Sequence, residues 1–134
     1  MAIRKILIVD DSPTERHVLN DMLTKAGFEV VASDNGEDAI HKSKHLKPDL
    51  ILMDVVMPGL DGIEATKLIR KDQPECRVVL VSGSIFVDRR DEGLEAARAA
   101  GASAYVIKSR AALDLAEVVV AVARSTGNVS GSSA

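Results

Sequence analysis

The stretch ILIVDDSPT, residues 6–14, places a run of apolar residues directly before two adjacent aspartates, Asp10 and Asp11. A short, continuous run of Ile, Leu and Val is typical of a strand that is covered on both faces of a parallel sheet. Neighbouring carboxylates repel each other and are costly to bury, so they need water or a cation nearby. The stretch therefore predicts a buried strand whose carboxyl end opens onto solvent.

Similar strands and intervening helices are expected along the rest of the chain. Four more short apolar runs lie at residues 30–32, 50–53, 78–81 and 105–107. Ser12 can cap a first helix, with Pro13 in its first position and Glu15 completing a capping box. Further helices are expected after Asn35 and Gly36, after Asp61 and Gly62, over roughly 91–100 and over roughly 111–124. Alternating strands and helices predict an α/β fold with a parallel sheet and right-handed crossovers.

The helical stretches carry apolar stripes that should face the sheet. The residues of these stripes are Val18, Leu19, Met22, Leu23 and Ala26 in the first helix, Ala39 and Ile40 in the second, and Ala65, Leu68 and Ile69 in the third.

Composition indicates one globular domain. The 134 residues are 46% hydrophobic and 28% charged, which suits a single packed core. A net charge of -3 and only three aromatic residues disfavour nucleic-acid binding. The single cysteine, Cys76, and the lack of a membrane-length apolar run are typical of a cytoplasmic protein without a membrane partner. We expect one domain over residues 1–124 and a flexible polar tail over 125–134.

Polar side chains stand at the carboxyl ends of the predicted strands, where open parallel sheets bind their ligands. We expect this edge to gather Asp10, Asp11, Asp54, Ser82 and Lys108. Three clustered carboxylates need a counter-charge, and oxygen ligands suit a hard cation such as Mg²⁺. The sequence therefore predicts a Mg²⁺ site there.

The same residues can carry phosphoryl transfer. A carboxylate can act as a nucleophile and form an aspartyl phosphate. The transfer needs positioning and charge neutralisation more than further covalent help. In this interpretation Mg²⁺ bridges Asp11, Asp54 and the phosphoryl group. Lys108 neutralises one phosphoryl oxygen, and Ser82 donates a hydrogen bond to another.

Four segments together resemble the receiver domain of two-component response regulators: ILIVDDS, LILMDVVMPGLDG, VVLVSGS and AYVIKS. The resemblance covers about residues 4–124. It implies a flavodoxin-like three-layer αβα sandwich with five helices and a five-stranded parallel sheet of order 2-1-3-4-5. It also implies that Asp54 is the phosphoacceptor, because DVVMPGLDG matches the family pattern D-x-x-M-P-x-x-D-G. Asp10 and Asp11 resemble the family's acidic pair, and the carbonyl of Val56 resembles the remaining Mg²⁺ ligand.

The resemblance also implies a role in signalling. Asp54 would receive its phosphoryl group from a histidine kinase or a phosphotransfer protein, so the chain would be a signalling domain and not an enzyme. The output would be binding of a downstream protein, or of a second copy as a dimer, through the face of the fourth helix, fifth strand and fifth helix. Tyr105 stands where the family has its switch aromatic. We expect a stand-alone regulator of the chemotaxis or motility type.

One departure from the family pattern and three alternatives stay open. Ser109 stands where the family usually has a cis proline after the lysine, and a cis bond before Ser costs about 3 kcal/mol. A degenerate receiver that binds partners without phosphorylation rests on Ser109 alone. A phosphatase of the haloacid dehalogenase type needs an aspartate where Val56 stands. A flavodoxin-like FMN or nucleotide binder needs a phosphate-binding loop after the first strand. The segment DDSPTER instead places acidic residues there, whose charge has the same sign as that of a phosphate.

Overall fold

The computed structural model describes residues 4–55, 57, 59–82 and 98–107. In chain order its elements are β1 (Lys5–Val9), α1 (Pro13–Lys25), β2 (Glu29–Ser33), α2 (Gly36–Leu46), β3 (Leu50–Asp54), α3 (Gly62–Asp72), β4 (Arg77–Ser82) and β5 (Ala104–Ile107). Each predicted strand is confirmed to within one residue at either end. The helix expected over 91–100 lies largely outside the described residues. The helix over 111–124 and the tail over 125–134 lie wholly outside them.

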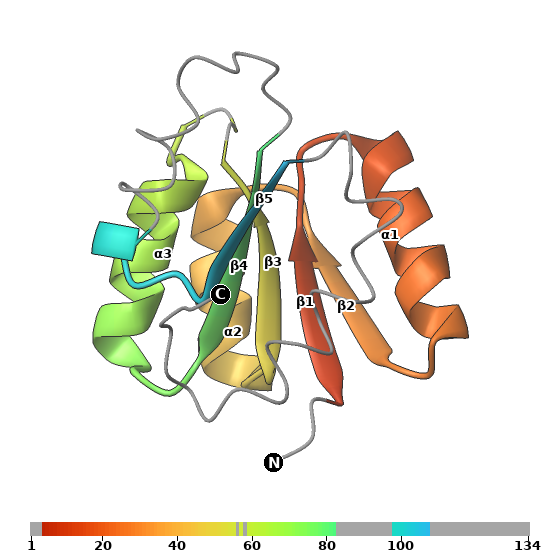
Figure 1. The fold of residues 1–134 in the computed structure, drawn as a ribbon, viewed down its shortest axis with the longest axis horizontal. Coiled ribbons are helices and arrows are strands. Elements are labelled where there is room, and N and C mark those ends of the chain that lie inside the picture. The colour runs from red at the N-terminus through yellow and green to blue at the C-terminus, as the bar shows by residue number, and fades with distance from the viewer. Residues whose placement is uncertain (1–3, 56, 58, 83–97, 108–134) are drawn as a thin grey trace.

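The strands form one parallel sheet of order β2-β1-β3-β4-β5, which confirms the predicted order (Figure 1). Strand β1 lies between β2 and β3, with Ile6 opposite Val30 on one side and Leu50 on the other. From β1 the chain crosses to β2 on one side, and it later returns to form β3, β4 and β5 on the other side. In such sheets the crevice outside the carboxyl ends of the two central strands is the usual ligand site.

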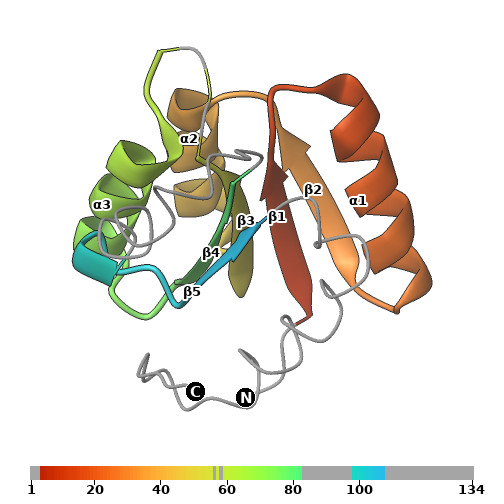
Figure 2. The ribbon, with the colours of Figure 1, turned by 45° about the horizontal axis from the view of Figure 1, so that its top comes forward.

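Helices cover both faces of the sheet. Helix α1 packs on one face, whereas α2 and α3 pack on the other (Figures 1 and 2). Alternate residues of each strand serve the two faces. The core on the α1 face contains Ile6, Ile8, Leu23, Leu50, Leu52, Val79 and Val81. The core on the α2 and α3 face includes Leu7, Val9, Ala39, Ile51, Met53, Ala65, Ile69, Val78 and Leu80. This double coverage confirms the αβα layering in the described part of the chain.

Each described helix begins with a side-chain cap close to a strand end. Ser12, Asn35 and Asp61 each accept a hydrogen bond from the backbone N–H three residues on, at 3.3, 2.7 and 2.8 Å. The capping box predicted at Ser12 is only half formed. The Ser12 N–H donates to Asp10 Oδ1 at 2.9 Å, so it is bound to the acidic pair and not to Glu15.

The predicted helical stripes are wrong at three positions. Val18 and Leu68 are each 47% exposed, and Ala26 is also exposed. In α3 the inward place beside Ala65 is taken by Thr66, which is fully buried and donates its Oγ1 hydrogen to Gly62 O at 2.7 Å. Periodicity locates the centre of a stripe, but the packing of neighbouring elements decides how wide the buried face is. In addition, none of the helices in the described part of the chain has the length and hydropathy needed to cross a bilayer.

Cys76 lies in the core just before β4 and is 4% exposed. Burial raises the pKa of its thiol to about 11 from an ordinary value of 9.0. The reactive form of a thiol is the thiolate, so alkylation at pH 8 should be slow in the folded protein. We expect iodoacetamide to label native Cys76 on the order of a hundredfold more slowly than the urea-unfolded chain. Intact-mass kinetics would measure both rates, and equal rates would contradict this prediction.

The same pKa shift makes the free energy of unfolding depend on pH. The folded chain holds the thiol proton more tightly than the unfolded chain does. Its contribution is therefore complete below pH 9.0 and is lost as the pH rises toward about 11. The loss should amount to about 2–3 kcal/mol. Urea unfolding of the Cys76→Ala variant provides the control, because this variant should lack that part of the pH dependence.

Candidate functional site

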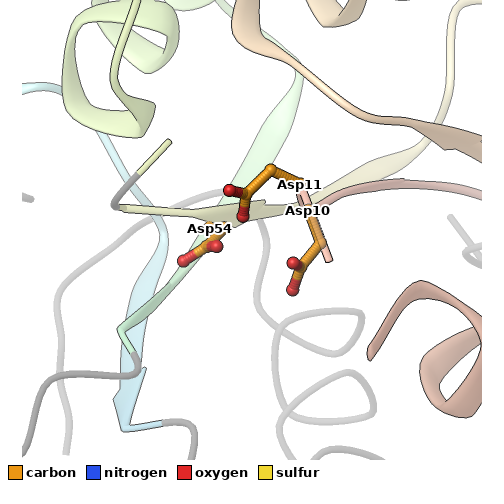
Figure 3. A group of neighbouring side chains, drawn as sticks. All are labelled: Asp10, Asp11 and Asp54. Atoms are coloured by element: carbon orange, nitrogen blue, oxygen red, sulfur yellow. The ribbon is translucent and has the colours of Figure 1, made fainter. Parts of the chain in front are cut away.

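Three of the predicted site residues meet at the carboxyl ends of β1 and β3. Asp10 and Asp11 directly follow β1, and Asp54 is the last residue of β3. The two strands are hydrogen-bonded neighbours, with Val9 opposite Met53. One carboxylate oxygen from each aspartate lies within 4.8 Å of the others (Figure 3). The prediction that this edge gathers the three carboxylates is confirmed.

The three carboxylates differ in their access to water. Asp10 is 1% exposed and Asp54 is 5% exposed, whereas Asp11 lies at the surface. Burying two charged carboxylates side by side is costly without a compensating positive charge. Because Asp11 leaves one side open, a cation from solvent can reach the cluster.

Backbone and side-chain hydrogen bonds hold Asp10 from three directions. Its N–H donates to Ser33 O at the end of β2, at 3.1 Å. Its Oδ1 accepts the Ser12 N–H at 2.9 Å, and its carbonyl oxygen accepts Arg16 Nη1 of α1 at 2.8 Å. The position of Asp10 therefore depends on both β2 and α1.

Asp54 is held between β4 and the start of α3. It lies opposite Val81 of β4, and the next N–H, that of Val55, donates to Val81 O at 3.0 Å. The Gly62 N–H donates to Val55 O at 2.9 Å. A Cβ atom added to Gly62 would lie only 2.0 Å from Asp54 O. The first residue of α3 thus contacts the Asp54 backbone so closely that a side chain would not fit.

The donor set fits a hard divalent cation. All three side chains offer oxygen, which Mg²⁺ prefers. One oxygen atom of each carboxylate lies within 4.8 Å of the others, which is close enough for small side-chain movements to bring them to a common cation. Asp10, Asp11 and Asp54 could therefore share one Mg²⁺ with water as the further ligands.

The other predicted site residues are only partly within the described structure. Ser82 ends β4, next to β3, and its backbone lies opposite Ile107 of β5. Lys108 follows Ile107 but lies outside the described residues, as do Val56 and Ser109. Tyr105 pairs with Leu80 through the backbone of β5, and its side chain is outside the description.

A polar network beside the site was missed by the sequence reasoning. Ser33 Oγ donates to Asp38 Oδ2 at 2.7 Å, and Lys42 Nζ lies 3.0 Å from the same oxygen. Lys42 Nζ also donates to Ala32 O at 2.7 Å. The hydrogen bond from Ser33 and then the one from Lys42 lower the pKa of the Asp38 carboxyl against the opposing effect of burial. The i,i+4 spacing of Asp38 and Lys42 was the available signal. The network secures the end of β2, whose Ser33 O holds Asp10.

Similarity to known proteins agrees with this geometry. The family model described as the response regulator receiver domain matches residues 6–120. The chain is 39% identical over 106 residues to the chemotaxis protein CheY of Thermotoga maritima, covering 78% of this chain and 85% of CheY. It is 41% identical over 121 residues to the response regulator protein VraR of Staphylococcus epidermidis, covering 89% of this chain. The match spans only 56% of VraR.

Solved structures show the same fold. The response regulator TrrA of Thermotoga maritima, crystallised in complex with Mg²⁺ and BeF, superposes with a TM-score of 0.78 at 32% identity. That superposition covers 90% of this chain and 99% of TrrA. The family match spans well over half of the chain, and the fold, strand order and acidic cluster are those that the four sequence segments predicted. The chain belongs to the family of response regulator receiver domains.

Proposed function

We propose that this chain accepts a phosphoryl group on Asp54 from a histidine kinase or a phosphotransfer protein, in a Mg²⁺-dependent reaction in the cytoplasm. The observation that carries the proposal is the convergence of Asp10, Asp11 and Asp54 within 4.8 Å at the carboxyl edge of the sheet. A receiver domain is a signalling domain, and in this proposal its own aspartate is the group that reacts.

The chemistry assigned to each residue follows from charge and position. Asp10, Asp11, Asp54 and the carbonyl of Val56 would hold Mg²⁺, which when bound supplies positive charge against the phosphoryl oxygens. An Asp54 oxygen attacks phosphorus while the bond from phosphorus to the donor's histidine nitrogen breaks. The electron pair of that bond leaves with the imidazole. Lys108 and Ser82 would take the remaining phosphoryl oxygens.

The output of phosphorylation is proposed to be a change in protein binding. The face built from residues about 91–100, β5 and residues about 111–124 would bind a downstream protein or a second copy of the chain, with Tyr105 as the switch. Only β5 and a few residues before it are described. We propose that the residues of this chain bind neither nucleic acid nor a membrane.

Family membership weighs against the phosphatase and FMN-binding alternatives, because the receiver match spans residues 6–120. The degenerate receiver remains the second candidate, and it rests on Ser109. Covalent phosphorylation separates the two, since a degenerate receiver would bind partners without it.

Incubation with acetyl phosphate and Mg²⁺ should add the mass of one phosphoryl group to the intact protein. The adduct should be absent in Asp54→Ala and in excess EDTA, because the nucleophile or the counter-charge is then missing. Asp72→Ala, at the exposed end of α3, removes the same charge away from the site and should leave the adduct unchanged. An adduct that persists in Asp54→Ala would contradict the assignment. A wild type that stays unmodified by both acetyl phosphate and phosphoramidate would favour the degenerate receiver.

A further inference from the structure

Arg16, in the first turn of α1, contacts the acidic segment through both its backbone and its side chain. Its N–H donates to Ser12 O at 3.0 Å, and its Nη1 donates to Asp10 O at 2.8 Å. We propose that Arg16 is a positioning residue for the cation site: by fixing the Asp10 carbonyl it raises the affinity of the three-carboxylate cluster for Mg²⁺. This inference rests on the proposed function in so far as it takes that cluster to be a Mg²⁺ site.

The carbonyl that Arg16 holds belongs to the peptide group that joins Asp10 to Asp11. A peptide group is planar, so fixing its oxygen also fixes the direction in which the chain continues to Asp11. The N–H and the carboxylate of Asp10 are already bound by Ser33 and Ser12. Arg16 therefore supplies the hydrogen bond that orients the second aspartate relative to the first.

A water molecule could replace Arg16 as a donor, but it would not be tethered to α1 and would not fix the direction of the Asp10 carbonyl. Asp10 is 1% exposed while Arg16 is in place, and truncation of Arg16 would replace its fixed donor with water from the adjoining cavity. Without the fixed donor, the peptide group is free to rotate toward water or toward another donor. Such a rotation would turn Asp11 away from Asp54 and widen a cluster whose oxygens already span up to 4.8 Å.

The positive charge of Arg16 should weaken Mg²⁺ binding, whereas its hydrogen bond to the Asp10 carbonyl should strengthen it. The direction in which Mg²⁺ affinity changes on removing Arg16 therefore tests the inference. Among the described residues, no ion pair joins Arg16 to a carboxylate, so its side chain contacts the cluster through the Asp10 carbonyl and not through a direct charge pair. A cation near the site repels Mg²⁺, and Coulomb's law alone predicts that removing Arg16 would raise Mg²⁺ affinity. The positioning role predicts that removing Arg16 would lower it.

Truncation of Arg16 should leave the fold intact. Its side chain is only partly buried and lines an open cavity of about 430 Å³ together with Ser33, Asp34 and Asp38. The change therefore removes no packed core atoms. The melting temperature in EDTA should stay close to that of the wild type, which separates positioning from a general structural role.

Mg²⁺ titration of the unphosphorylated protein, followed by amide chemical shifts, tests the proposal directly. Arg16→Ala should bind Mg²⁺ about tenfold more weakly, in line with the loss of a charge-assisted hydrogen bond. Arg16→Lys keeps a donor and the charge and should recover part of the affinity. Arg4→Ala, which removes the same charge from an exposed position, should match the wild type.

Unchanged or tighter Mg²⁺ binding in Arg16→Ala would overturn the positioning role, and so would a loss of affinity that only mirrors a lower melting temperature. A wild type that binds no Mg²⁺ would overturn this inference and the proposed function together. Mg²⁺ binding without a phosphoryl adduct would overturn the proposed function alone, and the Arg16 comparison would still decide the inference.

Discussion

Replacing Gly62 by alanine should slow phosphorylation of Asp54 by roughly a hundredfold, the usual penalty for displacing a reacting group by about 1 Å. An added Cβ would lie 2.0 Å from Asp54 O, 2.9 Å from Asp54 C and 3.0 Å from Met53 Cγ. The first two contacts are with backbone, which cannot move aside by changing a rotamer. Either α3 must shift away or the end of β3 must move, and both change where the Asp54 carboxylate lies.

The stability of Gly62→Ala should fall far less than its activity. Overpacking costs typically about 1–3 kcal/mol, and the better helix propensity of alanine offsets up to about 1 kcal/mol of this. Gly27→Ala is a matched control: Gly27 has a φ of +100° but no atom within 4 Å of its added Cβ. That variant should lose stability through backbone strain while phosphorylating at the wild-type rate. Wild-type kinetics in Gly62→Ala, measured by intact mass after acetyl phosphate addition, would show that the close contact does not position Asp54.

The second large effect should come from Asp11→Asn, which is expected to stabilise the protein without Mg²⁺ and to abolish its stabilisation by Mg²⁺. Like charges about 4 Å apart repel by about 1 kcal/mol even in water, so removing one relieves the cluster. The melting temperature in EDTA should therefore rise by a few degrees. The same substitution removes one of the three carboxylates that would hold the cation.

Thermal unfolding with and without Mg²⁺ measures both halves of this prediction. A ligand at about ten times its dissociation constant stabilises the folded state by about 1.4 kcal/mol. The wild type should show that gain, and Asp11→Asn should not. Asp72→Asn removes an equal charge at the far end of α3 and should behave as the wild type does. An equal Mg²⁺ shift in wild type and Asp11→Asn would mean that the cation binds elsewhere.

Local patterns were sufficient to predict a parallel sheet with an acidic edge, and the strand order followed from the resemblance to receiver domains. Continuous runs such as the one ending at Val9 mark strands covered on both faces, and the carboxyl ends of parallel strands must share an edge. Asp10, Asp11 and Asp54 follow from that rule. Val18 and Leu68 did not follow the expected pattern, because the width of a buried helix face depends on its neighbours.

The supports of the cluster could not be predicted in the same way. The contact from Arg16 to the Asp10 carbonyl joins a helix to the strand end before it, and no sequence spacing rule describes it. The sequence around Gly62 predicts only the start of a helix, because the close approach of Gly62 to Asp54 depends on how α3 docks against β3. The same holds for Ser33, whose hydrogen bond to Asp38 depends on how α2 lies beside β2.

The position of β1 between β2 and β3 also determines when the acidic cluster can first form during folding. Asp10 and Asp54 meet only after β1 and β3 have paired, and this pairing must close a loop that contains α1, β2 and α2. Non-local contacts of this kind form slowly, because chain entropy is lost before the contact is gained. Partly folded chains that contain only the N-terminal βαβ unit would lack Asp54 beside the acidic pair. The ability to receive a signal would thus be acquired late, once the central strands of the sheet are joined.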